Sequence, residues 1–326
     1  MRILITGGCG FIGSAIARFL YRQPQSNDEI FLVDTMQRHG TKSMNAFDSN
    51  QIKVIEADLA DPDSYQQFPS PIDRLYHLAA IVGVGPVESD PIKVMKTNTL
   101  STMYVLDWFS NNSSKDARFL FSSSSEVYSG AGMVGIELPI PTHEDVPVII
   151  PDVQHPRFSY ALTKMWGEAY SSFFSKNIFT TSVRYHNVYG PGMGYDHVIP
   201  QVISRILDQE NPFKIIAGDQ TRAFCWIEDA AKATYLTMES TEIKSGATVH
   251  IGNENEEIEI KDLYNLMFDI CQWKPQKTTI ISAPEASVQR RCPDTTLLKR
   301  LTNYTPKTPL KDGLTKTINW YTKQKK

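Results

Sequence analysis

The first thirteen residues of this chain constrain its fold more than any other stretch. An apolar run at residues 2–6 leads into a turn with regularly spaced glycines, and a helical pattern follows at residues 14–21. The glycines are Gly7, Gly10 and Gly13. A strand, a glycine turn and a helix N-terminus in this order form a pocket for a pyrophosphate, because the backbone can approach the ligand and the first N–H groups of the helix are free. The opening therefore predicts a site for a nucleotide cofactor.

A second apolar run, at residues 29–33, ends in Asp34. This carboxylate follows the last glycine by about twenty residues, the distance at which an acid binds the adenosine ribose hydroxyls. A carboxylate there would repel a 2′-phosphate, so the sequence favours NAD over NADP. Arg38 and Lys42 follow closely and could weaken that preference.

Composition and charge are those of an ordinary globular chain. The 326 residues are 41% hydrophobic and 21% charged, which suits one compact unit with two lobes. A net charge of −3 offers no broad attraction to nucleic acid or to an anionic membrane. No apolar run is long enough to cross a bilayer, and we expect no signal peptide. The four cysteines lie far apart without a CxxC pair, so we expect reduced thiols, no metal site and a cytoplasmic location.

Short β-rich runs alternate with helical patterns through the first 185 residues, which predicts a Rossmann-type doubly wound parallel sheet with helices on both faces. Expected strands lie at 2–6, 29–33, 52–55, 75–78, 119–121, 181–184 and 249–252, and expected helices at 91–110, 160–176 and 260–271. We expect an NAD-binding domain at 1–185 with returning segments near 222–252. A smaller C-terminal α/β substrate lobe is expected at 186–221 and 253–326.

A proline-rich segment at residues 129–156 separates Ser124 from Tyr160 and cannot be one continuous helix. Two interpretations remain open at this point. The segment either walls or covers the substrate pocket, or it is a surface insertion without a role.

Tyr160 and Lys164 are four residues apart and share one face of a helix. A free tyrosine has a pKa near 10 and is a poor base, but a nearby ammonium favours the phenolate. Ser124 follows the buried strand at 119–121, and polar residues also follow the strand at 181–184. Polar groups at several strand ends facing one crevice predict an active site.

These motifs, taken together, resemble the extended short-chain dehydrogenase/reductases, and more narrowly the nucleotide-sugar epimerases and dehydratases. The resemblance spans nearly the whole chain in the family's order. It rests on the following segments: Gly7-Gly8-Cys9-Gly10-Phe11-Ile12-Gly13, Asp58-Leu59, His77-Leu78-Ala79-Ala80, Ser124 with Tyr160-x-x-x-Lys164, Arg184-Tyr185-His186-Asn187-Val188-Tyr189-Gly190-Pro191, Gln220-Thr221-Arg222, and Arg290-Arg291-Cys292-Pro293-Asp294.

The resemblance implies NAD as cofactor, a nucleotide-diphosphate sugar as substrate, oxidation of the sugar at C4 to a 4-keto intermediate, and a homodimer. Ser124 would hold the sugar hydroxyl, Tyr160 would remove its proton, and Lys164 would tune Tyr160. Cofactor contacts are implied for Gly7, Gly10, Phe11, Ile12, Gly13, Asp34, Asp58, Leu59, Leu78, Ala79, Ala80, Asn98, Ser122, Tyr160, Lys164 and Tyr185. Substrate contacts are implied for Ser124, Ser125, Asn187, His197, Val198, Arg222 and Arg291, of which Asn187, Arg222 and Arg291 would hold the diphosphate.

The reaction after C4 oxidation is less constrained. Glu126 occupies the place of an acidic residue that the family's 4,6-dehydratases and decarboxylases carry, which slightly favours dehydration or a related step, with Glu126 as base. Ser125 departs from the aspartate of one dehydratase branch. His186 replaces the family's usual aromatic residue, either for packing or as an extra acid or base. Alternatives are a 4-epimerase, a C4-dehydrogenase or decarboxylase, and a non-catalytic NAD-sensing interaction protein.

Overall fold

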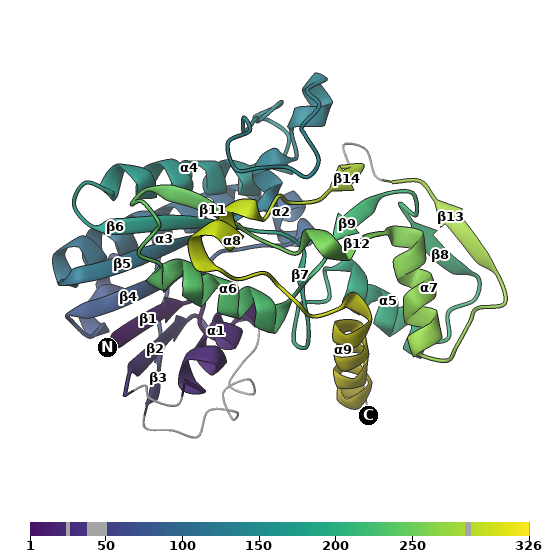
Figure 1. Cartoon of the computed structure of the whole chain (residues 1–326), viewed down its shortest axis with the longest axis horizontal. Helices are drawn as coiled ribbons and strands as arrows, with labels where there is room; N and C mark the ends of the chain where they lie inside the picture. Colours follow the sequence, from purple (N-terminus) through teal and green to yellow (C-terminus); the bar gives the residue numbers. More distant parts are fainter. Residues whose placement is uncertain (24–26, 38–50, 284–287, 326) are drawn as a thin grey trace.

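The computed structural model describes residues 1–23, 27–37, 51–283 and 288–325 (Figure 1). Its main sheet has seven strands in the order β11-β6-β5-β4-β1-β2-β3, and every neighbouring pair is parallel. The strands are β1 (Arg2–Thr6), β2 (Glu29–Asp34), β3 (Ile52–Glu56), β4 (Ile72–His77), β5 (Ser113–Ser124), β6 (Phe179–Tyr185) and β11 (Ala247–Ile251). The predicted doubly wound parallel sheet is confirmed.

Strand order reverses beside β1, because β2 and β3 extend the sheet on one side and β4 continues it on the other. β1 is almost wholly buried, as its apolar sequence requires between two layers of helices. In open parallel sheets, ligands bind outside the carboxyl ends of the strands at such a reversal. The topology therefore places a binding crevice next to the glycine turn.

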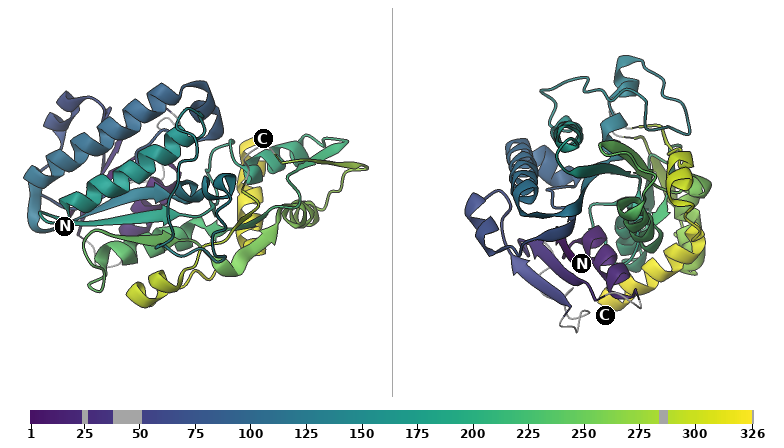
Figure 2. Two further views of the ribbon diagram at one scale, coloured as in Figure 1. Left: turned by 90° about the horizontal axis from the view of Figure 1, so that it is seen from above. Right: turned by 60° about the vertical axis from the view of Figure 1, so that its left-hand side comes forward.

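Helices cover both faces of the sheet (Figure 2). On one face, α3 (Pro91–Asn112) packs on α4 (Phe158–Phe174), with the short α2 (Val84–Ser89) beside α3. On the other face, α1 (Phe11–Tyr21) packs on α6 (Ile227–Glu239), and α8 (Thr296–Thr302) packs on α6 and β11. A short 3₁₀ helix, η2 (Pro62–Gln67), packs beside α3.

The expected boundary of α3 is wrong by two residues. Asn111 and Asn112 lie within its last turn rather than beyond it. Their side-chain amides donate hydrogen bonds to the carbonyl oxygens of Asp107 and Trp108, at 2.9 Å in each case. The two side chains thus add a second donor to carbonyl groups in the last turns, which is compatible with a helix that extends to Asn112. Similarly, α4 begins at Phe158 and ends at Phe174, two residues before the predicted end.

A smaller lobe is built mainly from the second half of the chain. Its helices are α5 (Val198–Leu207), α7 (Ile260–Ile270) and α9 (Leu310–Lys325), and its strands are β7 (Val188–Tyr189), β8 (Phe213–Ile216), β9 (Thr221–Ala223), β10 (Cys225–Trp226), β12 (Glu257–Glu259), β13 (Thr278–Ile281) and β14 (Arg290–Arg291). One apolar cluster joins the two parts, since it includes Ile5 of the main sheet and Ile203 and Phe213 of the lobe. The exact domain boundaries stay a prediction.

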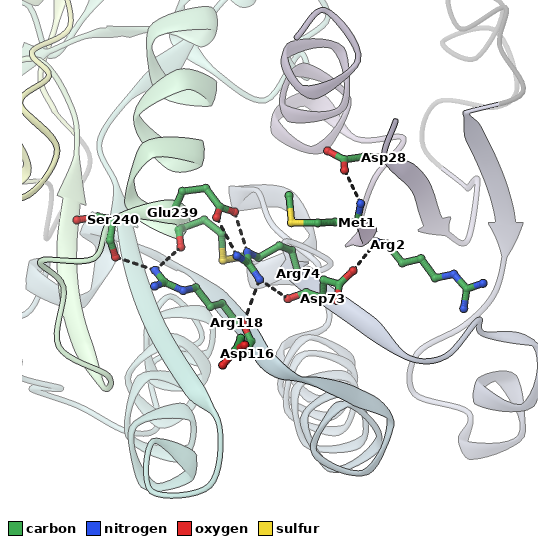
Figure 3. Close-up of polar contacts among 10 residues, drawn as sticks. Met1, Arg2, Asp28, Asp73, Arg74, Asp116, Arg118, Glu239 and Ser240 are labelled. Atoms are coloured by element: carbon green, nitrogen blue, oxygen red, sulfur yellow. Dashed lines mark hydrogen bonds and ion pairs between the residues drawn. The ribbon is translucent and has the colours of Figure 1, made fainter. Parts of the chain in front are cut away.

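Polar contacts join α6 to the main sheet at the end where β1 begins, away from the glycine turn (Figure 3). Arg74 forms a two-pronged ion pair with Glu239, at 2.7 and 2.9 Å, and Arg118 Nη1 donates to the carbonyl oxygens of Met238 and Ser240. Both arginines thereby bind the C-terminal end of α6 to β4 and β5. Positive charge at this end of a helix is stabilising, because the helix dipole is negative there. The ammonium group of Met1 pairs with Asp28 at 2.6 Å.

The 129–156 segment contains no long helix, as its prolines predict. It follows η3 (Ser125–Tyr128), includes the short η4 (Ala131–Val134), and stands above α4 near β14 in Figure 1. Within the described ranges of the chain, none of the helices has both the length and the apolar character needed to cross a membrane.

Candidate active site

A large cleft of about 2730 Å³ opens at the carboxyl ends of the main strands, between the sheet and the smaller lobe. The glycine turn, the ends of β2 and β5, the 190–197 loop and Arg291 all line it. Of the residues with predicted site roles, only three do not line the cleft, and these are Asn98, Val198 and Arg222. The fold therefore brings most of the predicted site residues to one place.

The glycine turn has the geometry that a pyrophosphate needs. Gly7 has φ +64°, and a Cβ atom there would come within 2.8 Å of the backbone N of Ala79. A Cβ atom at Gly13 would overlap the carbonyl oxygen of Gly7. Helix α1 begins directly after Gly10, which has no side chain to cap it. The free N–H groups of its first turn face the cleft and suit a phosphate group, so these residues fit a dinucleotide cofactor.

Asp34 lies at the end of β2, beside the glycine turn. Its Oδ2 accepts a hydrogen bond from the backbone N of Cys9 at 3.1 Å, and its Oδ1 accepts one from Met36 N at 3.0 Å. These two bonds hold the carboxylate at the cleft edge, where it suits a ribose. Arg38 and Lys42 lie outside the described residues, so their predicted influence on cofactor choice stays a prediction.

Asn98 does not line the cleft but binds the backbone of Ile81, which does. Its side chain accepts from Ile81 N at 2.7 Å and donates to Ile81 O at 3.1 Å, which fixes the backbone just after β4. Val198 is the first residue of α5, after His197. His197 itself lines the cleft, as does Asn187, whose side-chain amide donates to Ala223 O at 3.0 Å.

Tyr160 and Lys164 lie on the same face of α4, with Lys164 Nζ 5.5 Å from the centre of the Tyr160 ring. Lys164 Nζ also donates to the carbonyl oxygen of Ser122 at 2.7 Å. Burial lowers the pKa of Lys164 to about 7, and the carboxylate of Glu168 acts in the opposite direction. Tyr160, Lys164 and Ser124 all line the cleft, which therefore contains a phenol, an amine and a hydroxyl.

A buried ion pair supports these groups from behind. Arg184 of β6 binds Glu168 of α4 through two contacts of 2.8 and 2.6 Å. Glu168 also accepts a short hydrogen bond from Ser123 Oγ, and Arg184 donates a short one to the hydroxyl of Tyr128. The pair thus joins α4, β5, β6 and η3 around the residues that line the cleft.

Glu126 pairs with Arg291 across the cleft. Arg291 Nη1 donates to Glu126 Oε1 at 2.7 Å and to Ser125 Oγ at 3.3 Å, while the backbone N of Glu126 donates to Ser124 Oγ at 3.2 Å. Burial alone would raise the pKa of Glu126, but the nearby Arg291, Arg157 and Arg222 lower it below its usual range. Glu126 is therefore an ionised carboxylate.

Three arginines surround this one carboxylate. β14 pairs with β9 so that Arg291 lies beside Arg222, while Arg157 precedes α4. Burial lowers the pKa of Arg222 to about 10; repulsion from Arg291 and Arg157 adds to the shift, and Glu126 opposes it. The guanidinium of Arg222 turns to Thr221 O and Gln220 Oε1 instead of lining the cleft. The cluster keeps an excess of positive charge, which suits an anion.

Arg157 was not singled out from the sequence, yet it lines the cleft. Its position three residues before Tyr160 was the available signal. His186, in contrast, is 1% exposed and does not line the cleft. Neither of its ring nitrogens has a hydrogen-bond partner among the described residues, and burial holds its pKa well below the usual range. The ring packs 4.6 Å from that of His250, so the geometry supports packing over acid–base chemistry.

Comparison with known proteins places this geometry in context. The model of the NAD dependent epimerase/dehydratase family matches residues 3–252. The chain is 30% identical to the UDP-N-acetyl-alpha-D-glucosaminuronate decarboxylase of Bacillus cytotoxicus, over 98% of this chain and 97% of that protein. It is 28% identical to the dTDP-glucose 4,6-dehydratase of Salmonella typhimurium, over 98% and 92%. Its structure resembles the UDP-glucuronic acid 4-epimerase of Bacillus cereus, with a TM-score of 0.85, 25% identity, and coverage of 99% and 100%.

Proposed function

This chain belongs to the NAD-dependent epimerase/dehydratase family, and we propose that it is a decarboxylase of a nucleotide-diphosphate uronic acid. It is an NAD-dependent enzyme of nucleotide-sugar chemistry. The observation that carries the finer proposal is the cluster of Arg157, Arg222 and Arg291 around Glu126, with the non-acidic Ser125 beside it.

The proposed reaction begins with oxidation at C4 of the sugar. Ser124 holds the C4 hydroxyl, and Tyr160 removes its proton. The Nζ atom of Lys164 lies 5.5 Å from the centre of the Tyr160 ring. When this amine is protonated, its positive charge stabilises the phenolate of Tyr160. Bound NAD supplies the electron acceptor for this oxidation.

The product of this first step is a 4-keto sugar. If C6 is a carboxylate, it lies β to the new ketone and the molecule can lose carbon dioxide without an added acid. The C5–C6 bond breaks, its electron pair forms an enolate with the C4 carbonyl, and a proton from solvent then adds at C5. Arg291 would hold the carboxylate before it leaves, since its guanidinium binds Ser125 and Glu126, the two residues that follow Ser124 in the chain. Glu126 orients Arg291.

Dehydration is the second candidate, because Glu126 is ionised and can remove a proton next to a ketone. Elimination of water also needs a general acid that protonates the leaving hydroxyl group. Ser125 stands where such an acid is expected and accepts a hydrogen bond from Arg291 instead. This favours decarboxylation, and it agrees with the likeness to a decarboxylase at 30% identity.

The remaining site assignments are also proposals. Gly7, Gly10, Phe11, Ile12 and Gly13 would bind the cofactor pyrophosphate, Asp34 its ribose, and Asp58, Leu59, Leu78, Ala79 and Ala80 the groove around it. Asn98, Ser122 and Tyr185 would also contact the cofactor. Asn187 and Arg222 would hold the nucleotide diphosphate, and His197 and Val198 would contact the substrate. Arg291, for which the resemblance also implies a diphosphate contact, would instead hold the sugar carboxylate. We also propose a cytoplasmic location, given that none of the four cysteines, all of them among the described residues, forms a disulfide. A homodimer through α3 and α4 fits the exposure of Ile92 and Phe173, which are 78% and 77% exposed.

Product analysis tests the proposal directly. Purified protein with NAD is incubated with UDP-glucuronate, UDP-N-acetylglucosaminuronate, UDP-glucose and their GDP and dTDP counterparts, and products are identified by mass spectrometry and proton NMR. Release of labelled carbon dioxide from a uronate supports decarboxylation. Loss of water from a hexose would instead establish a dehydratase, and an isobaric product with inverted C4 would establish an epimerase.

A further inference from the structure

The residues that follow Arg291 are bound to a distant part of the chain. Thr142 N donates to Cys292 O at 2.8 Å, and Asp294 N donates to Thr142 O at 2.7 Å, so that Thr142 and Pro293 form a parallel bridge. Thr142 is buried. These two reciprocal bonds fix the backbone within one residue of Arg291.

Thr142 belongs to a segment, residues 138–146, that is itself anchored. Glu144 Oε1 accepts from the backbone N of His250 at 2.8 Å, and the carbonyl oxygen of Glu144 accepts from Arg184 Nη1 at 2.9 Å. Val146 is buried in one cluster with Val127 and Tyr128 of η3. The 138–146 segment is therefore bound to β11, to β6 and to η3, the element that carries Glu126.

His250 also binds the stretch that follows Arg291. Its Nδ1 lies 3.1 Å from Asp294 O, and its Nε2 lies 2.7 Å from the hydroxyl of Tyr128. A carbonyl can only accept, so Nδ1 carries the proton and Nε2 accepts from the tyrosine. Burial lowers the pKa of His250 to about 3, which keeps the ring neutral. Residues 292–294 are thus hydrogen-bonded both to Thr142 of the 138–146 segment and to His250.

This anchoring opposes a repulsion. Arg291, Arg222 and Arg157 lie close enough to influence one another and Glu126, and among the described residues Glu126 is the carboxylate whose charge offsets those of Arg291 and Arg222. A flexible arginine in such a cluster would move away from its like-charged neighbours. A backbone fixed on both sides confines the guanidinium of Arg291 to the position opposite Glu126.

We propose that the 138–146 segment positions Arg291, through Thr142 and Glu144, for the step that follows C4 oxidation. This inference rests on the proposed function, because it assigns that later step to Arg291 and Glu126. Of the proline-rich segment, only His155 lines the cleft, so the 138–146 part does not wall it; its proposed role is the indirect one of holding the backbone next to Arg291.

The test compares variants that break the anchoring with matched variants that keep it. Thr142→Pro removes the N–H that binds Cys292, whereas Thr142→Ala keeps both backbone bonds. Glu144→Ala removes the acceptor for His250 N, whereas Glu144→Gln keeps an acceptor oxygen. Asp145→Ala, at an exposed neighbouring residue, is the general control.

Full-length variants loaded with NAD are followed by rapid mixing with substrate, which separates reduction of the bound cofactor from product formation. In Thr142→Pro and Glu144→Ala, cofactor reduction should stay within about threefold of wild type, while the later step slows by about tenfold to 100-fold, as expected for a group displaced by about an ångström. Reduced cofactor should therefore accumulate. The rate of the later step should begin to fall at a higher pH than in wild type. Displacement of Arg291 leaves Glu126 with Arg157 and Arg222 alone, so the pKa of Glu126 rises. The matched variants Thr142→Ala and Glu144→Gln, and the general control Asp145→Ala, should behave as wild type.

Equal slowing of both steps, or an unchanged later step in folded Glu144→Ala, would overturn the proposal. Circular dichroism and gel filtration establish folding, and Glu144→Ala decides the matter if Thr142→Pro does not fold. The two proposals fail separately. The identity of the wild-type product decides the proposed function, whereas the ratio of the two rates in the variants decides the positioning role, whichever product forms.

Discussion

Arg291 and Glu126 are 165 residues apart in the chain, and their side chains meet at 2.7 Å between Nη1 and Oε1. Glu126 comes from η3 at the end of a main-sheet strand, and Arg291 comes from β14 of the smaller lobe. The ion pair therefore bridges the cleft at the place where the proposed sugar carboxylate would bind. The distance between these two side chains therefore depends on how the smaller lobe packs against the main sheet.

Replacing Arg291 should impair turnover of a nucleotide-diphosphate uronate far more than its oxidation. Arg291→Gln removes the cation that binds Glu126 and Ser125 and leaves Glu126 with a weaker, uncharged partner. We expect kcat/KM for the uronate to fall by about 100-fold, the effect of losing a buried charged contact of about 3 kcal/mol. Arg290→Gln, at an exposed neighbour, is the control. An unchanged kcat/KM would remove Arg291 from the mechanism.

Glu126→Gln should spare cofactor reduction and slow the later step. The pKa of Glu126 lies below the usual glutamate range because of Arg291, Arg157 and Arg222, so the wild-type later step should decline only in strongly acidic solution. The variant should lose this acidic limb, because glutamine does not titrate. Steady-state pH profiles of product formation provide the measurement. The same limb in both proteins would show that another group titrates.

Tyr160→Phe and Lys164→Met should each prevent substrate from reducing bound NAD. The phenol is the proposed base for the C4 hydroxyl, and Lys164 stabilises its ionised form, so we expect losses of about 10²-fold to 10⁴-fold in the first step. Absorbance of the reduced cofactor after mixing gives the rate. If both variants still reduce the cofactor normally, the base lies elsewhere.

Local patterns in the sequence predicted the glycine turn and the Tyr160–Lys164 pair, because both depend on spacing within one strand–turn–helix or one helix. The parallel sheet followed from alternating apolar runs. The ion pair of Arg291 with Glu126 was not predicted, since it depends on the register of β14 against β9. That register joins segments almost seventy residues apart, and no local pattern encodes it.

The indirect role of Asn98 shows a second limit. The resemblance implied a cofactor contact, and the structure shows an amide that holds the backbone of Ile81 at 2.7 and 3.1 Å. Which group a buried amide binds depends on the loop that folds over it. Sequence spacing identifies the residue but not its partner.

Lys164 also predicts how stability depends on pH in the protein without cofactor. Its pKa is about 7 in the folded chain and 10.5 for an ordinary lysine, so the unfolded state binds more protons between these values. Folding stability should therefore rise with pH from about 7 to about 10.5, and the penalty of burying the charge is greatest below pH 7. Lys164→Met removes this contribution. Urea unfolding of both proteins across this range should show the variant losing its relative advantage as pH rises. If the free energy of unfolding depended on pH in the same way in both proteins, the lowered pKa of Lys164 would be contradicted.

Arg74 should matter for stability and not for catalysis. Its ion pair with Glu239 is largely buried, with side chains 14% and 26% exposed, and it lies at the sheet end opposite the cleft (Figure 3). Arg74→Met leaves the carboxylate of Glu239 without its partner, so we expect a loss of about 2 kcal/mol in the free energy of unfolding, within the range for partly buried pairs. The double variant Arg74→Met/Glu239→Gln should recover part of this loss, because no unpaired charge remains. Urea unfolding measures both effects, and kcat should stay at the wild-type value in each variant. A fall in kcat at full folding would contradict a purely structural role for Arg74.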